Sequence, residues 1–186
     1  ITSLANPDPG LQFVLLSDFT DAGREQMPGD QDILEKAQRE IKRLNSRYTS
    51  RYGDKFFVLH RKREWNPTEN TWMGWERKRG KLEQLNSLLC HPAEDSPFSY
   101  VFGNFTESIG TIPVRFVLTL DADTRTPPDS IVDLVRIAGH PLNRAWYDRE
   151  AGRVTKGYGI IQPRISIPPD AANKSLFARI FSGNVG

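Results

Sequence analysis

Apolar residues along the chain gather in short continuous runs at three places. These runs are FVLLS at residues 13–17, FFVLH at residues 56–60 and RFVLTL at residues 115–120. Each run is bounded by polar residues and has the length of a single strand inside a sheet. The pattern therefore predicts three buried strands.

Other segments repeat their apolar positions every three or four residues, with charged residues on the opposite face, which is typical of helices packed on a core. This spacing predicts helices at residues 32–48, 81–89 and 130–138, and a last helix at residues 173–181. The stretch 61–80 is rich in Trp, Arg and Lys, has no clear period, and is expected to form a long irregular segment. The segment that begins at His140 is expected to form a hairpin connection leading into a strand around residues 158–162.

Strands and helices thus alternate, which predicts a single α/β domain with a mainly parallel sheet flanked by helices. Ligand sites in such sheets lie at the carboxyl ends of the strands. Four carboxylates follow two of the predicted strands: Asp18 and Asp21 come after the first, and Asp121 and Asp123 after the third. We expect these side chains to point toward one edge of the sheet.

Composition narrows the class of protein only slightly. Of the 186 residues, 38% are hydrophobic and 26% charged, as in ordinary globular domains, and the net charge is +2. A charge this small indicates no particular partner, and no nucleic-acid partner is expected. No apolar run approaches the roughly 18 residues of a membrane helix. The single cysteine, Cys90, excludes an internal disulfide, and the missing initiator Met leads us to expect a piece of a larger protein.

The strongest chemical signal is the pair Asp121 and Asp123 after the third apolar run. Residues two apart at a strand end point the same way, and two like charges this close repel each other. Mg²⁺ or Mn²⁺ would remove that penalty, because such ions bind one or two carboxylates together with substrate phosphates. The alternative is a solvated turn in which an Asp forms local hydrogen bonds.

A second chemistry is compatible with the same stretch. Phosphatases of the haloacid dehalogenase type carry an apolar strand that ends in Asp-x-Asp-x-Thr or Val, and there the first Asp is the nucleophile. Asp121 would take that role here. Arg125 occupies the fifth position of the motif, and two strand–helix units precede it, so both features count against this hypothesis.

Basic residues gather where the 81–89 helix is expected to begin. Cations at a helix N-terminus oppose the macrodipole, so they do not serve helix stability. A helix start with lysine and arginine can instead bind a pyrophosphate, although a solvated basic turn is the simpler interpretation. The cluster consists of Arg77, Lys78, Arg79 and Lys81. Upstream, Asp18 and Asp21 could accept hydrogen bonds from a base or ribose, or form an Asx turn.

The order of these segments resembles that in inverting glycosyltransferases of the GT-A fold. The order is a strand with SDFTDA, a helix opened by KRGKLEQLN, and a strand with LDADTRTPPD. Longer strings are similar to the glycosyltransferase domain of cyclic β-1,2-glucan synthases, over essentially the whole chain. These strings are WMGWERKRGKLEQLNSLL, FVLTLDADTRTPPDSIVDLV, AGHPLNRAWYD and RVTKGYGIIQPRISI.

The resemblance implies roles for individual residues. Asp121 and Asp123 would bind Mg²⁺ or Mn²⁺ together with the diphosphate of UDP-glucose. Lys78, with Lys81 as the alternative, would neutralise phosphate charge, and Asp18 would contact the uridine. Gln162 or Arg164 would line the sugar or acceptor side.

The resemblance also implies a larger context. Enzymes of this family are inner-membrane proteins of bacteria, so the expected place is the cytoplasmic face, beside the remaining domains of the parent polypeptide and a glucan acceptor. The first strand of the fold is expected before Ile1 and the catalytic base after Gly186, so the isolated chain is expected to be inactive. The expected function is inverting transfer of glucose to a growing β-1,2-glucan. A nucleotide-sugar binding module without catalysis and the phosphatase are the alternatives.

Overall fold

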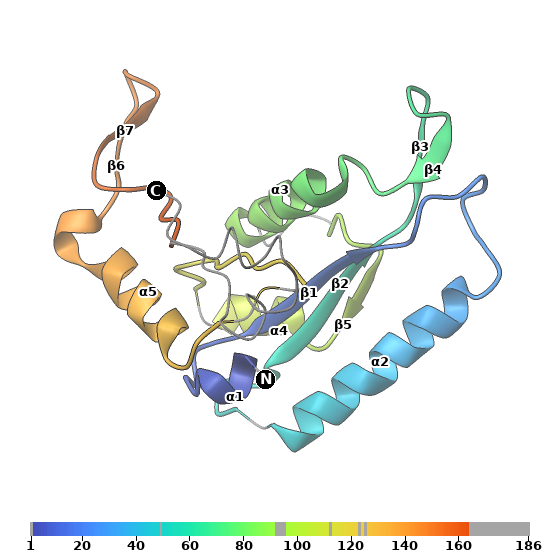
Figure 1. Ribbon diagram of the computed structural model, residues 1–186, viewed down its shortest axis with the longest axis horizontal. Helices are drawn as coiled ribbons and strands as arrows, with labels where there is room; N and C mark the ends of the chain where they lie inside the picture. The colour runs from blue at the N-terminus through green and yellow to red at the C-terminus, as the bar shows by residue number, and fades with distance from the viewer. Residues whose placement is uncertain are drawn as a thin grey trace, which may run out of the picture. The chain divides into compact units, whose positions relative to one another are not determined.

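Figure 1 shows the computed structural model of the protein, with its elements labelled in chain order. The structure describes residues 2–48, 50–91, 96–111, 113–122, 124 and 126–163. The chain divides into two compact units, Ile1–Asp129 and Ser130–Gly186, and each is described by itself.

A three-stranded sheet of order β1-β2-β5 forms the centre of the first unit. β1 (Phe13–Asp18) runs parallel to β2 (Phe56–Arg61), and β5 (Tyr100–Phe102) runs antiparallel to β2. The first two predicted strands are confirmed. The sheet is mixed, however, and not mainly parallel as predicted, because the short β5 was not recognised and it pairs in the opposite sense.

Helices cover both faces of this sheet, as expected for an α/β unit (Figure 1). α2 (Asp30–Arg47) packs over β2 and β5. α3 (Arg77–Cys90) and α4 (Phe105–Thr111) cover the other face. Because side chains alternate along a strand, Phe57 and Leu59 point to this second face. The main core cluster there contains Phe57, Leu59, Leu85, Leu88, Phe98, Phe105 and Ile109.

The third predicted strand, at residues 115–120, is wrong: this segment has no regular secondary structure. Its apolar side chains are between 39% and 47% exposed. An extended segment becomes a strand only when its backbone groups pair with a neighbour. Within the described part of the chain no strand pairs with this segment. It therefore stays irregular, although its apolar pattern favours a buried strand.

The expected irregular segment 61–80 contains a two-stranded hairpin. β3 (Glu64–Asn66) pairs antiparallel with β4 (Thr71–Met73), and Trp65 lies directly opposite Trp72. The indole rings lie 5.9 Å apart, tilted by 58°. A backbone bridge between Ala22 and Trp72 attaches the hairpin to the loop after β1.

The remaining elements are short. α1 (Thr2–Ala5) opens the first unit, and the amide of Asp129 donates to the carbonyl of Ala5. The second unit contains α5 (Ser130–Gly139), the 3-10 turn η1 (Pro141–Asn143), and a hairpin of β6 (Trp146–Asp148) and β7 (Arg153–Lys156).

These elements confirm the helix predicted at 130–138 and the hairpin connection. The strand expected around 158–162 is wrong, because these residues have no regular structure. The helix expected at 173–181 lies outside the described residues. Among the described helices, none is both long and apolar enough to cross a membrane.

Two leucines on neighbouring strands test which face of the sheet forms the core. Leu59 of β2 is fully buried in the core cluster, whereas Leu15 of β1 is 59% exposed. We expect Leu59→Ala to lower the free energy of unfolding by about 2–5 kcal/mol through lost packing and a residual cavity. Leu15→Ala is the matched control and should cost less than about 0.5 kcal/mol. Urea unfolding measures both, and equal losses would contradict the assignment of the core.

Candidate donor-phosphate site

Four of the residues predicted for the donor site come together at the start of α3. The ammonium of Lys78 forms an ion pair with the carboxylate of Asp121. The ammonium of Lys81 lies 3.1 Å from the carboxylate of Asp18. Residues three apart lie on the same face of a helix, so one face of α3 presents both lysines. The predicted residues therefore form one local group, although they come from three separate parts of the sequence.

Buried Arg61, the last residue of β2, ties this group to the sheet. Its Nε and Nη2 donate to the two carboxylate oxygens of Asp18 at 2.6 Å and 3.0 Å. Its Nη1 donates to the carbonyl of Trp75 and to the side chain of Gln84, both at 2.9 Å. Its Nη2 also donates to the carbonyl of Arg77 at 3.1 Å. A guanidinium has five N–H donors, so these contacts engage all of them.

Two glycines allow the close contacts around this arginine. A Cβ on Gly74 would lie 2.5 Å from the carboxylate carbon of Asp18. A Cβ on Gly80 would lie 2.1 Å from the carbonyl oxygen of Trp75. A larger residue at position 74 would collide with Asp18 of β1, and one at position 80 would collide with Trp75 in the turn itself. The second clash gives the glycine of the KRGKL string a structural reason.

The turn before α3 has an unusual backbone. Glu76 and Arg77 have φ angles of 49° and 46°, in the left-handed region that residues with a side chain seldom adopt. The amide of Arg77 donates to the carbonyl of Gly74 and closes the turn. No side chain caps the helix at Glu76, and the first turn of α3 holds no acidic residue. The conformation is thus held from outside the helix.

Each basic residue predicted to bind phosphate has an acidic partner. Arg77 pairs with Asp21 at 2.8 Å and with Glu69 at 2.6 Å. These two carboxylates raise the pKa of Arg77 further, and the hydrogen bond that Arg77 donates to Glu69 is the main cause. The other pairs are Lys78–Asp121, Arg79–Glu76 and Lys81–Asp18. The start of α3 is therefore a charge-balanced surface and not a free positive patch.

A second buried arginine lies two residues after the first. Arg63 donates to both carboxylate oxygens of Asp30, at 2.6 Å and 3.1 Å, and to the carbonyls of Thr20 and Glu25. These bonds hold the loop between β1 and α2. The hydrogen bond from Arg63 lowers the pKa of Asp30 below its ordinary value. Arg61 and Arg63 thus fix different segments from the same end of β2.

His60 is buried, and its ring packs against the rings of Phe19 and Tyr100. Its Nδ1 lies 2.9 Å from the hydroxyl of Ser17, and its Nε2 has no hydrogen-bond partner among the described residues. Burial lowers the pKa of His60 below its ordinary value of 6.5, and the charges of Asp18 and Asp30 offset part of this effect. The ring is therefore neutral in the folded protein at neutral pH.

Two other predicted residues, Asp123 and Arg164, lie outside the described residues, as does Arg125. Gln162 is exposed in the second unit. Among the described residues, no group of three or more acidic, histidine or cysteine side chains lies close enough together to hold a metal ion. The predicted metal pair therefore stays a prediction, with only Asp121 located.

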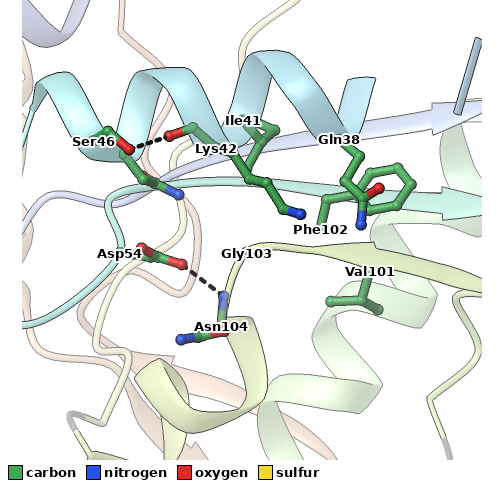
Figure 2. Close-up of a pocket in the computed structure, with 10 residues that line it drawn as sticks. Gln38, Ile41, Lys42, Ser46, Asp54, Val101, Phe102, Gly103 and Asn104 are labelled. Carbon is green, nitrogen blue, oxygen red and sulfur yellow. Dashed lines mark hydrogen bonds between the residues drawn. The ribbon is translucent and has the colours of Figure 1, made fainter. Parts of the chain in front are cut away.

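A separate pocket of about 600 Å³ lies in the first unit, between α2 and the end of β5. Figure 2 shows the residues that line it. None of the predicted site residues lines it. Asp54 accepts a hydrogen bond from the backbone amide of Asn104 there, at 2.9 Å (Figure 2). The other lining residues are Gln38, Ile41, Lys42, Asn45, Ser46, Val101, Phe102 and Gly103.

Arg61 and Arg63 were not recognised from the sequence, where RKREW was grouped with the irregular segment. The sequence carries no signal for their burial, because residues 61–64 (RKRE) are all charged. Only the structure shows that Arg61 and Arg63 are buried while Lys62 and Glu64 are exposed. The β3–β4 hairpin, in contrast, has a sequence signal. Residues of high strand propensity flank the turn-rich stretch 66–70 (NPTEN).

The comparisons with known proteins relate this chain to glucan synthases. It is similar to the cyclic beta-(1,2)-glucan synthase NdvB of Rhizobium meliloti (strain 1021), with 41% identity over 186 residues. The match covers 98% of this chain and 6% of that protein, so the chain corresponds to a small segment of it. No protein-family model matches the chain. The resemblance seen in the sequence motifs is thus confirmed.

The burial of His60 predicts how stability depends on pH. Below its ordinary pKa of 6.5 the unfolded chain takes up a proton that the folded protein resists, so the free energy of unfolding should fall. We expect the loss between about pH 7.5 and 5.5 to be smaller in His60→Phe than in the wild type. His91→Gln, at an exposed histidine, is the control and should keep the wild-type slope. Chemical unfolding at each pH measures this. A wild-type slope in His60→Phe would contradict the assignment.

Proposed function

We propose that this chain is the donor-phosphate part of a glycosyltransferase that transfers glucose from UDP-glucose to a growing β-1,2-glucan, with inversion and with help from a divalent metal. One observation carries the proposal. Lys78, Lys81, Asp18 and Asp121, predicted independently of any structure, lie together at the start of α3. The similarity to the glucan synthase NdvB over 98% of the chain supports the same class of reaction.

The residues present fit a divalent metal. Asp121 is 59% exposed and its carboxylate oxygens are the hard ligands that Mg²⁺ and Mn²⁺ prefer. Asp123 would be the second carboxylate. Such ions keep several waters and take the rest of their ligands from substrate phosphates, so two protein carboxylates suffice. When bound, the metal would act as a Lewis acid on the diphosphate leaving group.

The charge balance at α3 supports a metal-dependent site. Without a metal, a diphosphate would find every nearby lysine and arginine already paired with a carboxylate. With a metal on Asp121, Lys78 would become free to pair with phosphate. The Lys78–Asp121 pair is exposed on both sides, and such surface pairs contribute little stability, so this exchange would cost little.

In the proposed reaction, an acceptor hydroxyl of the glucan attacks the anomeric carbon of glucose from the face opposite the diphosphate. The new bond joins the acceptor oxygen to that carbon, and the bond to the phosphate oxygen breaks, so UDP leaves with the electron pair. A base expected after Gly186 takes the hydroxyl proton. The residues of this chain would bind and orient the donor, and Lys78 and Lys81 would stabilise the charge on the departing diphosphate.

Calorimetry with UDP tests the site. We expect binding in the presence of Mn²⁺ and much weaker binding without it. Asp121→Ala should weaken binding by about tenfold or more, and Lys78→Ala by a similar factor, because each removes a charge-assisted contact to the ligand. Asp133→Ala is the matched control, since Asp133 forms a similar exposed pair with Arg136 and should leave binding unchanged.

Three outcomes would overturn the proposal. Binding of UDP that is unchanged in Asp121→Ala would remove the metal site. If the protein hydrolysed a generic phosphate ester and Asp121→Asn abolished this activity, the protein would instead be a phosphatase with Asp121 as nucleophile. Metal-dependent binding without any transfer, in the whole parent polypeptide as well, would indicate a binding module.

A further inference from the structure

We infer that Arg61 is a positioning residue for the donor-phosphate site: its buried guanidinium holds the left-handed turn at Glu76 and Arg77, and so sets where Lys78 and Lys81 lie. This inference rests on the proposed function for its ligand. The clamp itself, defined as Arg61 with its acceptors Asp18, Trp75, Arg77 and Gln84, rests only on the contacts described above.

The turn needs an external support. Residues with a side chain are disfavoured in the left-handed region, and here Glu76 and Arg77 adopt it in succession. Strained backbone of this kind persists only when its surroundings determine it, and it is concentrated at functional sites. The two carbonyls that Arg61 binds, on Trp75 and Arg77, flank Glu76. Arg61 therefore forms hydrogen bonds to the backbone on both sides of the strained residue Glu76.

Only an arginine can make this clamp. Its planar fork binds the carboxylate of Asp18 with two parallel bonds and still has donors for both carbonyls and for Gln84. A lysine keeps the charge but has three donors on one atom, so it cannot reach all of these acceptors. Arg61 is 3% exposed, so any acceptor that loses its donor would be left away from water.

The clamp acts on the ligand site through the helix. Lys78 follows Arg77 directly, and Lys81 lies on the same helical face three residues later. A helix is rigid over this length, so a shift of its first turn moves both ammonium groups. Misplacement of binding groups by about 1 Å can cost up to about 100-fold in catalysis. Arg61 itself is buried beneath the turn and is not a catalytic residue.

A binding experiment separates positioning from stability, with Arg63 as the matched control. Arg63 is equally buried, forms the same two-bond carboxylate pair and holds a different segment. We expect Arg61→Lys to weaken binding of UDP with Mn²⁺ by about tenfold, the effect of a lost charged hydrogen bond. Arg63→Lys, compared at a temperature where both variants are folded, should stay within about twofold. Equal weakening in the two variants would overturn the inference.

Glycine at position 76 provides a rescue test. Glycine adopts the left-handed region without steric cost, so the turn would depend less on the clamp. The double variant Arg61→Lys/Glu76→Gly should regain part of the affinity that Arg61→Lys loses. No recovery would indicate that Arg61 does not act through this turn. If Arg61→Lys does not fold, Gln84→Met, which removes one acceptor of the clamp, should weaken binding about threefold, and an unchanged affinity would count against the inference.

Hydrogen exchange tests the clamp without a ligand. Arg61→Lys should speed exchange at the amides of the first turns of α3 more than at those of α2, and Arg63→Lys should do the reverse. If the wild-type chain fails to bind UDP with Mn²⁺, the proposed function is wrong. The exchange pattern still decides whether Arg61 holds the turn, and equal exchange at α3 in both variants would show that it does not.

Discussion

The buried ion pair between Arg61 and Asp18 is the interaction on which the rest of the first unit depends. Burying two charges costs several kcal/mol unless each finds partners, and here every guanidinium donor has one. The bonds join the ends of two parallel strands to the turn that starts α3. Loss of Asp18 would leave the buried guanidinium without its carboxylate, a change that costs about 3–5 kcal/mol in comparable pairs.

The same contacts define how Asp18 could take part in binding. A carboxylate offers about four acceptor positions, and Arg61 and Lys81 occupy three of those on Asp18. A contact from Asp18 to a uridine therefore stays a prediction, with one acceptor position left for it. Because Gly74 packs against this carboxylate, the group is held in place. Asp18 thus connects the sheet, the turn and the lysines of α3, whatever its direct contact with a ligand.

Local periodicity predicted the longer strands and helices of the described fold, but not the three-residue strands β3, β4 and β5. The runs at 13–17 and 56–60 pair with each other, and the helices of 32–48 and 81–89 cover their faces. The run at 115–120 has the same pattern but no paired neighbour, and pairing cannot be read from one segment. Burial of Arg61 and Arg63 was also missed, because a charged residue is expected outside unless its partners, distant in sequence, are known. The candidate site residues were predicted from motif order, which, unlike pairing, is visible in the sequence.

The central claim is that the lysines at the start of α3 and Asp121 form one binding site for a metal and a diphosphate. Paramagnetic broadening of amide resonances by Mn²⁺ in the presence of UDP tests it most directly. The account predicts broadening at residues 77–81 and at Asp121, with Asn45 and Asn104 beside the separate pocket left sharp. Broadening centred on that pocket would contradict the claim. Broadening at α3 that is unchanged when UDP is left out, or when Asp121 is replaced by Ala, would contradict it as well.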